Sequence, residues 1–290
     1  MGISPALPPS IILEPLIHQW LLEDLGRGDR TTEAILAGDP SVGMAQLRLK
    51  QSGMVAGLPL LEQVFKKLDS RVSVEYFVKE GESVQSGTKV AQIQGPLSTL
   101  LMGERVALNL LMPLSGIATL TRRYADLIAD LPTQLVDTRK TTPGLRLLEK
   151  YATAVGGAQN HRFGLDDAVM IKDNHIIAAG GIRAAIERVR QSMPFPLAIE
   201  VETESLDQVT EAITHHADII MLDNMTPVLM QEAVQIIRKG SDRIKIEASG
   251  NITLDTIREV AETGVDYIST SAPITQATWL DFSLRFMSAH

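Results

Sequence analysis

Residues 137–175 gather most of the side chains that could hold a small polyanion. Their sequence, DTRKTTPGLRLLEKYATAVGGAQNHRFGLDDAVMIKDNH, places cations where short apolar runs end or where a Gly-Gly step opens a loop. Guanidinium groups match carboxylate and phosphate oxygens two at a time, while an ammonium acts as a point charge. The side chains concerned are Arg139, Lys140, His161, Arg162 and Lys172.

A solvated basic face is the alternative for the same segment. Four carboxylates lie close by in the sequence, and exposed ion pairs of this kind contribute little. These carboxylates are Glu149, Asp166, Asp167 and Asp173. On residue counts alone the two interpretations are about equal, so the elements that carry the cations must decide between them.

Composition limits the classes of protein that this chain can be. It has 290 residues, 44% of them hydrophobic, and a formal net charge of -8. The mean hydropathy is +0.07 and the isoelectric point about 5.3, which argues against broad nucleic-acid binding. The absence of cysteine excludes disulfides, thiolate nucleophiles and cysteine-ligated zinc. No apolar run approaches the roughly 20 residues of a membrane span, and the start MGISPALPPSIILEP does not resemble a signal peptide. We therefore expect a cytoplasmic protein with no membrane or nucleic-acid partner.

The first third of the chain predicts an α+β domain over about residues 30 to 100. Apolar spacing indicates helices over 11–25 and 58–68, and alternation indicates strands within 42–56 and 72–78. Short strands with glycine turns follow over 78–96. A helical pattern then runs over 97–131, which Pro113 should interrupt.

After Pro132 a strand–loop–helix unit repeats six times. Because the apolar runs are continuous rather than alternating, we expect parallel strands buried on both faces. Six such units favour a (β/α) barrel, complete or incomplete, over an open sheet, and neither GxGxxG after a strand nor GxxxxGK[ST] occurs. The runs lie at 135–136, 168–171, 197–201, 219–222, 244–246 and 267–269, and the helices near 143–155, 176–191, 205–216, 226–239, 253–263 and 276–287.

Polar residues collect at the carboxyl ends of these runs. Glu200 and Glu202 are two apart in one strand, so both point to the same side, and buried carboxylates need a cation or a metal nearby. The carboxyl-terminal mouth of a β/α barrel is where its active sites lie. A catalytic, anion-binding mouth is therefore favoured over a solvated face. The polar ends are Arg139 and Lys140; Lys172, Asp173 and Asn174; Glu202; Asp223 and Asn224; Glu247, Ser249, Gly250 and Asn251; and Thr270 and Ser271.

The last two loops could hold a phosphate. They precede expected helices near Thr253 and after Ser271, and free backbone N–H groups at such positions point at an anion. A phosphoribosyl donor would fit phosphate loops at one edge and cations at the other, with Glu202 and Asp223 facing the ribose, Mg²⁺ and the developing cationic charge. A Schiff-base aldolase using Lys172 or Lys140 remains the rival within barrels.

The chain closely resembles the quinolinate phosphoribosyltransferases, the carboxylating nicotinate-nucleotide pyrophosphorylases of the NadC family. The resemblance rests on residues 137–176 together with EDLGRGDRTT, ERVALNLLMPLSGIAT, IEVE, MLDN and EASGNI. It implies a type II phosphoribosyltransferase fold: an N-terminal open-faced α/β sandwich domain over residues 1–115, which a C-terminal helix over 276–290 could rejoin, and an incomplete (β/α) barrel over 116–275.

The resemblance also implies an activity: a Mg²⁺-dependent glycosyltransferase (pentosyltransferase) of NAD biosynthesis. It would join quinolinate to phosphoribosyl pyrophosphate and release pyrophosphate and CO₂ to leave nicotinate mononucleotide. The implied assembly is a homodimer, or a higher oligomer built from it, in which Arg105 enters the partner's site. A paralogue like the molybdenum-transport-associated ModD proteins, or an anion-binding protein on the same fold, is the alternative.

Roles carried over by the resemblance fall into three groups. Ser271 stands in the last phosphate loop where the family commonly has glycine, so that loop is its main departure. The quinolinate clamp would be Arg139, His161, Arg162 and Lys172, with Arg105 entering from the partner and Lys140 touching both substrates; Thr138 would also bind substrate. Glu202 and Asp223 would be the ribose and Mg²⁺ carboxylates, and the phosphate grips would be Ser249, Gly250, Asn251, Thr270, Ser271 and Ala272. The catalytic residues would be Lys140, Lys172, Glu202 and Asp223.

Overall fold

The computed structural model describes residues 5–287, which form two compact units. The first contains the chain up to Arg122, Leu147–Gly156 and the segment from Gln276 onward. The second contains Arg123–Arg146 and Gly157–Thr275. The domain limit that we expected between residues 115 and 116 lies inside a helix, and one helical segment of the second half of the chain, residues 147–156, belongs to the first unit.

An antiparallel sheet of four strands, in the order β12-β1-β5-β3, forms the centre of the first unit. Its side chains alternate between core and surface, as in β1, where Ala45, Leu47 and Leu49 are fully buried, so one face of the sheet packs in the core. The elements of this unit are α1 (Ser10–Leu25), α2 (Arg30–Leu36), β1 (Val42–Leu49), β2 (Gly53–Met54), α3 (Leu58–Leu68), β3 (Ser73–Tyr76), β4 (Ser83–Val84), β5 (Lys89–Pro96), most of α4 (Leu97–Asp126), α5 (Arg146–Gly156) and β12 (Phe282–Phe286).

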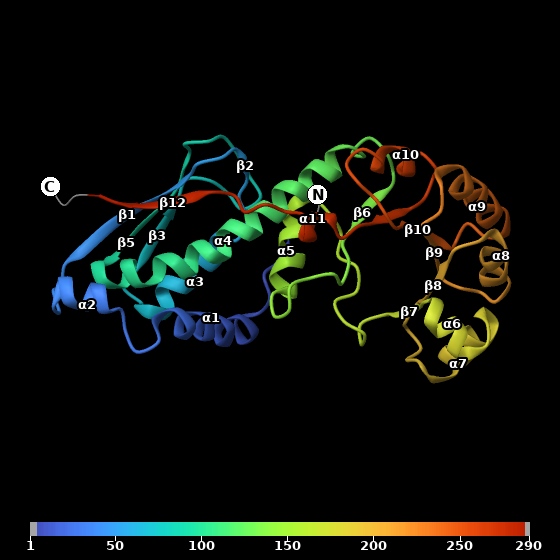
Figure 1. The fold of residues 1–290 in the computed structure, drawn as a ribbon, viewed down its shortest axis with the longest axis horizontal. Coiled ribbons are helices and arrows are strands. Elements are labelled where there is room, and N and C mark those ends of the chain that lie inside the picture. Colours follow the sequence, from blue (N-terminus) through green and yellow to red (C-terminus); the bar gives the residue numbers. More distant parts are fainter. Residues whose placement is uncertain (1–4, 288–290) are drawn as a thin grey trace. The chain divides into compact units, whose positions relative to one another are not determined.

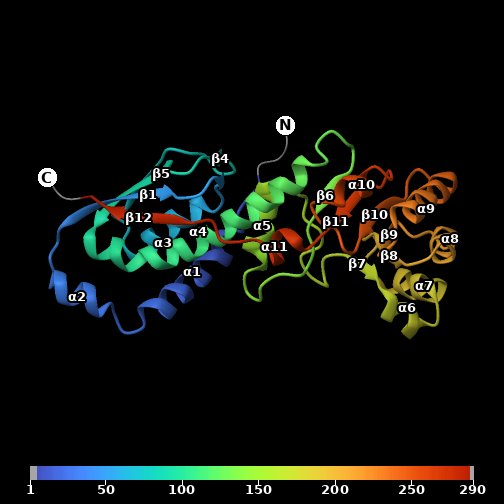
Figure 2. The same ribbon diagram turned by 45° about the horizontal axis from the view of Figure 1, so that its top comes forward.

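The C-terminal segment corrects one expectation. We predicted a helix over 276–287, but β12 instead pairs antiparallel with β1, with Leu284 opposite Leu47. Both views show the two strands side by side (Figures 1 and 2). The sequence FSLRF alternates apolar and polar residues, and Phe282 and Leu284 are buried, so a period of two describes it better than a helical one. Residues 288–290 lie outside the described part of the chain.

A second correction concerns α4, which runs without interruption through Pro113. Leu111 and Leu114 on either side of the proline are buried, and this packing outweighs the backbone hydrogen bond that proline cannot donate. The helix is long and apolar enough to cross a membrane by length and composition, but 61% of its apolar window is buried inside the protein. That burial is typical of a core helix.

The second unit contains a parallel sheet of six strands in the order β6-β11-β10-β9-β8-β7. Within the described residues its two end strands, β6 and β7, do not pair with each other, so the barrel is incomplete, and the fold class expected from the sequence is confirmed. The elements are β6 (Gln134–Val136), β7 (Val169–Ile171), α6 (Asp173–Ala179), α7 (Ile182–Ser192), β8 (Ile199–Thr203), α8 (Leu206–Thr214), β9 (Ile219–Asp223), α9 (Pro227–Gly240), β10 (Lys245–Ser249), α10 (Ile257–Ala261), β11 (Tyr267–Ser269) and α11 (Ala272–Thr275).

Strands of this sheet are mostly apolar because both of their faces are covered. All five residues of β8 are buried, and so are the three central residues of β9 and of β10. Helices α6 to α9 flank the strands (Figure 1). Since parallel strands end at the same edge, the loops that follow them share one side of the unit, and the polar residues of those loops meet there.

Candidate active site

Glu202, Asp223 and Ser249 mark the carboxyl-terminal edge of the parallel sheet. Glu202 in β8 lies opposite Met221 in β9, and Asp223 at the end of β9 lies opposite Ser249 at the end of β10. This register places Asp223 and Ser249 at one level of neighbouring strands, and Glu202 two residues before that level, opposite Met221 and in line with Glu247. The edge is therefore the mouth of the incomplete barrel.

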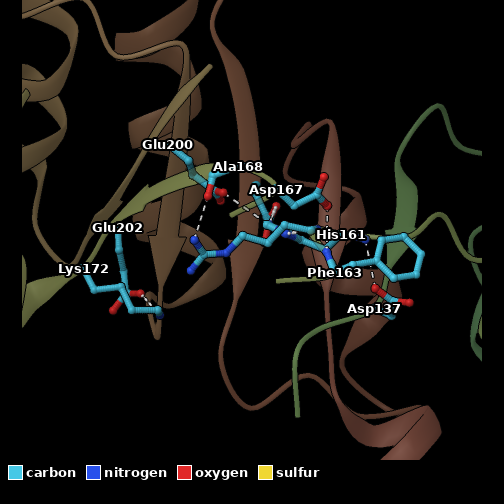
Figure 3. A network of polar contacts seen from close by, with 10 residues as sticks. Asp137, His161, Phe163, Asp167, Ala168, Lys172, Glu200 and Glu202 are labelled. Atoms are coloured by element: carbon cyan, nitrogen blue, oxygen red, sulfur yellow. Dashed lines mark hydrogen bonds and ion pairs between the residues drawn. The ribbon is translucent and has the colours of Figure 1, made fainter. Parts of the chain in front are cut away.

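Lys172 caps the mouth beside β8. It precedes α6, and its Nζ forms an ion pair with Glu202 Oε2 (Figure 3). The carboxylate is mostly buried, with 10% of its side chain exposed, whereas 45% of the lysine side chain is exposed. The pair thus reaches from the strand into solvent, and a ligand can approach both charges.

Glu202 and Asp223 supply oxygen donors of the kind that Mg²⁺ prefers. They end adjacent strands, and Asp223 Oδ2 also accepts a hydrogen bond of 2.7 Å from Asn224 Nδ2. Carboxylates held by neighbouring amide and ammonium groups at an open mouth are suited to a Mg²⁺ ion that retains water or substrate ligands. The donor set fits the metal expected from the sequence.

His161 lies between two buried carboxylates from different strands. Its Nε2 is 3.2 Å from Glu200 Oε2 and 3.5 Å from Glu247 Oε2, and the two glutamate side chains are 3% and 5% exposed. On its other side, Nδ1 accepts the backbone N–H of Arg162 at 2.7 Å, while the backbone N–H of His161 donates to Asp137 Oδ1 at 2.9 Å. Both ring nitrogens of His161 therefore have hydrogen-bond partners inside the protein.

The same three groups, which could also ligate a metal ion, share protons. Burial lowers the pKa of His161, but hydrogen bonds to Glu200 and Glu247 outweigh it and bring this pKa to about 10. Burial also raises the pKa of Glu200. A second ring proton would lie on Nδ1, where the Arg162 N–H already points, so the hydrogen bonds favour an Nε2–H ring with the further proton on Glu200, whose pKa is raised. The cluster holds the same number of protons in either arrangement.

Arg139 and Arg162 present positive charge beside this cluster. Burial and then the neighbouring Arg139 lower the pKa of Arg162, and Arg162 donates from Nη1 to the carbonyl of Ala168 at 2.8 Å. The buried Nε of Arg139 has no hydrogen-bond partner among the described residues. A buried donor without an acceptor costs free energy, and an anion bound between the guanidinium groups would remove that cost.

Lys140 and Thr138 continue the first loop. Lys140 is exposed, and its backbone N–H donates to Thr138 Oγ1 at 3.1 Å. This hydrogen bond fixes the turn after Asp137 while leaving the lysine ammonium accessible. The first loop therefore supplies a second exposed ammonium in addition to that of Lys172.

The loop after β10 has a backbone that only certain residues adopt. Gly250 has φ 94° and Asn251 φ 54°, both in the left-handed region that favours glycine and asparagine. A Cβ on Gly250 would lie 2.2 Å from Asn224 Oδ1, and that same oxygen accepts a hydrogen bond of 3.1 Å from Asn251 Nδ2. The loops after β9 and β10 are thus locked together beside Asp223.

Thr270 ties the last loop to its neighbour. Its hydroxyl donates to the carbonyl of Ile252 at 3.3 Å and accepts the backbone N–H of Ala272 at 3.2 Å. The helices that follow the two loops, α10 and α11, are only five and four residues long. Backbone groups of the loops themselves, rather than long helices, therefore form this part of the mouth together with Ser271.

The second unit thus contains every predicted site residue except one. Arg105 lies in the first unit, on α4, where its side chain is exposed and no carboxylate among the described residues lies within ion-pair distance. The surface ion pair with Glu104, its alternative, is absent there. Two residues outside our site prediction, Glu200 and Glu247, complete the cluster around His161; their signal in the sequence was a carboxylate inside a buried strand.

An antiparallel α/β unit, an incomplete parallel barrel and a cation-rich mouth with carboxylates define a class of phosphoribosyl-transferring proteins. The family model described as "Quinolinate phosphoribosyl transferase, C-terminal domain" matches residues 117–285. The model of the N-terminal domain of the same family matches residues 29–115. The chain belongs to the quinolinate phosphoribosyltransferase family, as the sequence resemblance indicated.

Individual relatives agree with this assignment. A Synechocystis protein named "Probable nicotinate-nucleotide pyrophosphorylase (carboxylating)" is 54% identical over 281 residues, covering 97% of this chain and 95% of the relative. A Bacillus subtilis protein of the same name is 43% identical over 94% of this chain and 92% of its own. The crystal structure of NadC from Streptococcus pyogenes superposes with a TM-score of 0.92 at 40% identity, over 98% of this chain and 100% of that one.

Proposed function

We propose that this protein transfers the phosphoribosyl group of phosphoribosyl pyrophosphate to quinolinate, with loss of CO₂, and so makes nicotinate mononucleotide for NAD biosynthesis. The names of its relatives support this reaction. One structural observation supports it most strongly: Arg139, with its unmet buried donor, follows β6 at the same edge of the parallel sheet as the carboxylates Glu202 and Asp223. A dicarboxylate acceptor and a sugar diphosphate need these opposite charges side by side.

The cationic side of the mouth is proposed to hold quinolinate. Arg139 and Arg162 repel each other and have donors to offer, and Lys172 adds an ammonium at the rim. His161 and Thr138 belong to the same end, and Arg105 would complete it from another subunit. Lys140, exposed on the loop after β6, would touch both substrates.

Carboxylates on the other side are proposed to face the ribose and Mg²⁺. Glu202 and Asp223 would hold the metal through water or substrate oxygens, and bound Mg²⁺ would neutralise charge on the pyrophosphate. The same carboxylates stabilise the positive charge that develops on the ribose as the pyrophosphate leaves. Ser249, Gly250 and Asn251, with Thr270, Ser271 and Ala272, would hold the 5′-phosphate through hydroxyl and backbone N–H groups.

Bond formation explains the decarboxylation. The pyridine nitrogen of quinolinate attacks ribose C1′ and pyrophosphate departs, which leaves the nitrogen bonded to carbon and positively charged. When the bond from C2 to its carboxylate breaks, CO₂ leaves and the electron pair stays at C2, where the adjacent cationic nitrogen stabilises it until a proton replaces the carboxylate. The protein mainly positions the reactants and supplies charge.

We further propose a cytoplasmic homodimer. The lack of cysteine fits a reducing compartment, and the exposed Arg105 on α4 fits a residue that serves a neighbouring subunit. An assembly of dimers into a larger oligomer is compatible with the same role.

Product release tests the reaction. Purified protein with Mg²⁺, quinolinate and phosphoribosyl pyrophosphate should release CO₂ and pyrophosphate in equal amounts, and neither should appear when one substrate is omitted. Binding of quinolinate without release of either product would instead identify an anion-binding protein. Turnover with another acid in place of quinolinate would identify a paralogue of the ModD kind.

A further inference from the structure

Two buried carboxylates around His161 need an explanation that the proposed reaction does not supply. Glu200 and Glu247 come from β8 and β10, and both approach Nε2 of the same ring. Neither is among the residues assigned to a substrate. Each also has a buried oxygen, Oε1, with no hydrogen-bond partner among the described residues.

Stability does not explain this arrangement. Burying two like charges costs free energy, and apolar side chains of similar size would pack the interior of a barrel at least as well. The unmet oxygens add to that cost. The benefit must therefore lie in what the carboxylates do to the histidine between them.

That effect follows from the ring's hydrogen bonds. An ionised carboxylate accepts but does not donate, and the pair keeps acceptor oxygens facing Nε2 even when Glu200 holds a proton, so Nε2 carries the ring proton that points at Glu200 and Glu247. With its proton on Nε2, the ring leaves Nδ1 as an acceptor, and Nδ1 receives the backbone N–H of Arg162 at 2.7 Å. The carboxylates thus fix the tautomer, and the tautomer fixes the backbone of Arg162.

Arg162 is the residue that this arrangement holds in place. Its backbone N–H is held by His161, and its guanidinium is held by the carbonyl of Ala168. The preceding peptide is held as well, because the His161 N–H donates to Asp137. A guanidinium fixed at both of its ends spends less conformational entropy on binding a carboxylate.

We propose that Glu200 and Glu247 are positioning residues that hold His161 as its Nε2–H tautomer, so that Nδ1 anchors the backbone of Arg162 for binding the dicarboxylate acceptor. This inference rests on the proposed function, since it assumes that Arg162 meets quinolinate. It assigns His161 an indirect role, because its two ring nitrogens are already engaged within the protein. A ring that instead contacted quinolinate through Nε2 would have to leave both carboxylates.

Two replacements of His161 separate these roles. The side-chain oxygen of asparagine lies near the position of Nδ1, whereas the end of glutamine lies near that of Nε2. We expect His161→Asn to keep an acceptor for Arg162 and to raise KM for quinolinate only a few-fold. We expect His161→Gln to raise it about tenfold to a hundredfold, the cost of leaving the backbone N–H of Arg162 without an acceptor. The opposite order would overturn the proposal.

Glu247 offers a second, independent pair of variants. Glu247→Gln retains an acceptor for Nε2–H and should raise KM for quinolinate less than Glu247→Leu does, while KM for phosphoribosyl pyrophosphate stays within about twofold of wild type in both. Equal increases in both KM values would mean a general structural effect and would overturn the proposal. Glu232→Leu is the matched control, since Glu232 is exposed on α9, and it should change neither constant.

The tautomer can be read without turnover. In ¹⁵N NMR of the wild-type protein, Nε2 of His161 should carry a proton and Nδ1 should not. A proton on Nδ1 would overturn the inference even in an active enzyme. Conversely, a wild-type protein with the expected tautomer but no quinolinate-dependent CO₂ release would refute the proposed function, so the two failures are distinguishable.

Discussion

Arg139 carries a buried N–H that no acceptor among the described residues meets. Such a donor is costly in the free protein and becomes useful when a carboxylate arrives. Lys172 is held in the opposite way, because it already has a partner in Glu202. These two cations therefore differ before a ligand binds: Arg139 has an N–H without an acceptor, and Lys172 is already paired.

Removing either cation should stop the reaction without unfolding the protein. We expect Arg139→Ala and Lys172→Ala each to lower kcat/KM by about a hundredfold or more, since each removes charged donors from the acceptor site. Thermal unfolding should show midpoints close to that of wild type. Near-normal rates in both variants would contradict the site assignment.

Protons of the His161 cluster predict a pH dependence of stability. The pKa of His161 is raised from 6.5 to about 10 in the folded protein, so the folded state holds a proton that the unfolded state loses first. The resulting stabilisation is fully present below pH 6.5 and is lost as the pH rises toward 10. Urea unfolding should therefore show that the stability difference between wild type and His161→Asn shrinks between pH 6.5 and pH 10. A constant difference across this range would exclude the shared proton.

At the scale of elements, α4 is held by a close approach of the C-terminal segment. A Cβ on Gly116 would lie 2.1 Å from the backbone carbonyl oxygen of Thr278, and Leu280 donates its N–H to the Met112 carbonyl at 3.1 Å. Only glycine leaves room for the chain to cross the helix at this point. The crossing leads the chain to β12 and so closes the sheet of the first unit.

Gly116→Ala should therefore destabilise the protein although alanine favours helices. Overpacking against a backbone atom costs about 1–3 kcal/mol, more than the gain of up to about 1 kcal/mol in helix propensity. Denaturant unfolding should show a lower midpoint with an unchanged slope. The control is Asn109→Ala on the exposed side of α4, which should change the unfolding free energy by no more than about 0.5 kcal/mol; equal effects of the two would contradict the crossing.

Local sequence patterns were enough to predict the strands of the parallel sheet, but not the cluster of His161 with two buried glutamates. Each of the six apolar runs became a strand, because a run buried on both faces has a signal within its own residues. The C-terminal strand was missed because its five alternating residues are few and a helical period fits the longer segment. His161, Glu200 and Glu247 come from a loop and two strands far apart in the chain, and only the folding of the second unit brings them together.

At the scale of the whole molecule, the role proposed for Arg105 makes each active site depend on two chains. Alone, Arg105→Ala should lack the donated cation and Lys140→Ala should lack its own. In mixed dimers one of the two sites would have both residues intact. Mixing the inactive variants should therefore restore up to about a quarter of the wild-type activity, the share expected from random pairing of chains that form two-fold dimers.

Subunit exchange must be verified before the mixture is assayed. Differently tagged chains that co-purify after mixing would show that exchange has taken place. Exchange without any recovered activity would argue against donation across the interface. Mixing Arg105→Ala with Arg105→Ala chains carrying the other tag is the matched control and should restore nothing.

The ion pair between Lys172 and Glu202 links the two halves of the reaction. In the proposed function its members serve different substrates, so the substrate that binds first would separate them and leave the other residue free for the second substrate. The first ligand bears this cost for both, and each substrate should bind more tightly when the other is present, by the same factor in either order. Before substrates bind, the ion pair thus acts as a shared barrier, which the two substrates together overcome more readily than either one alone.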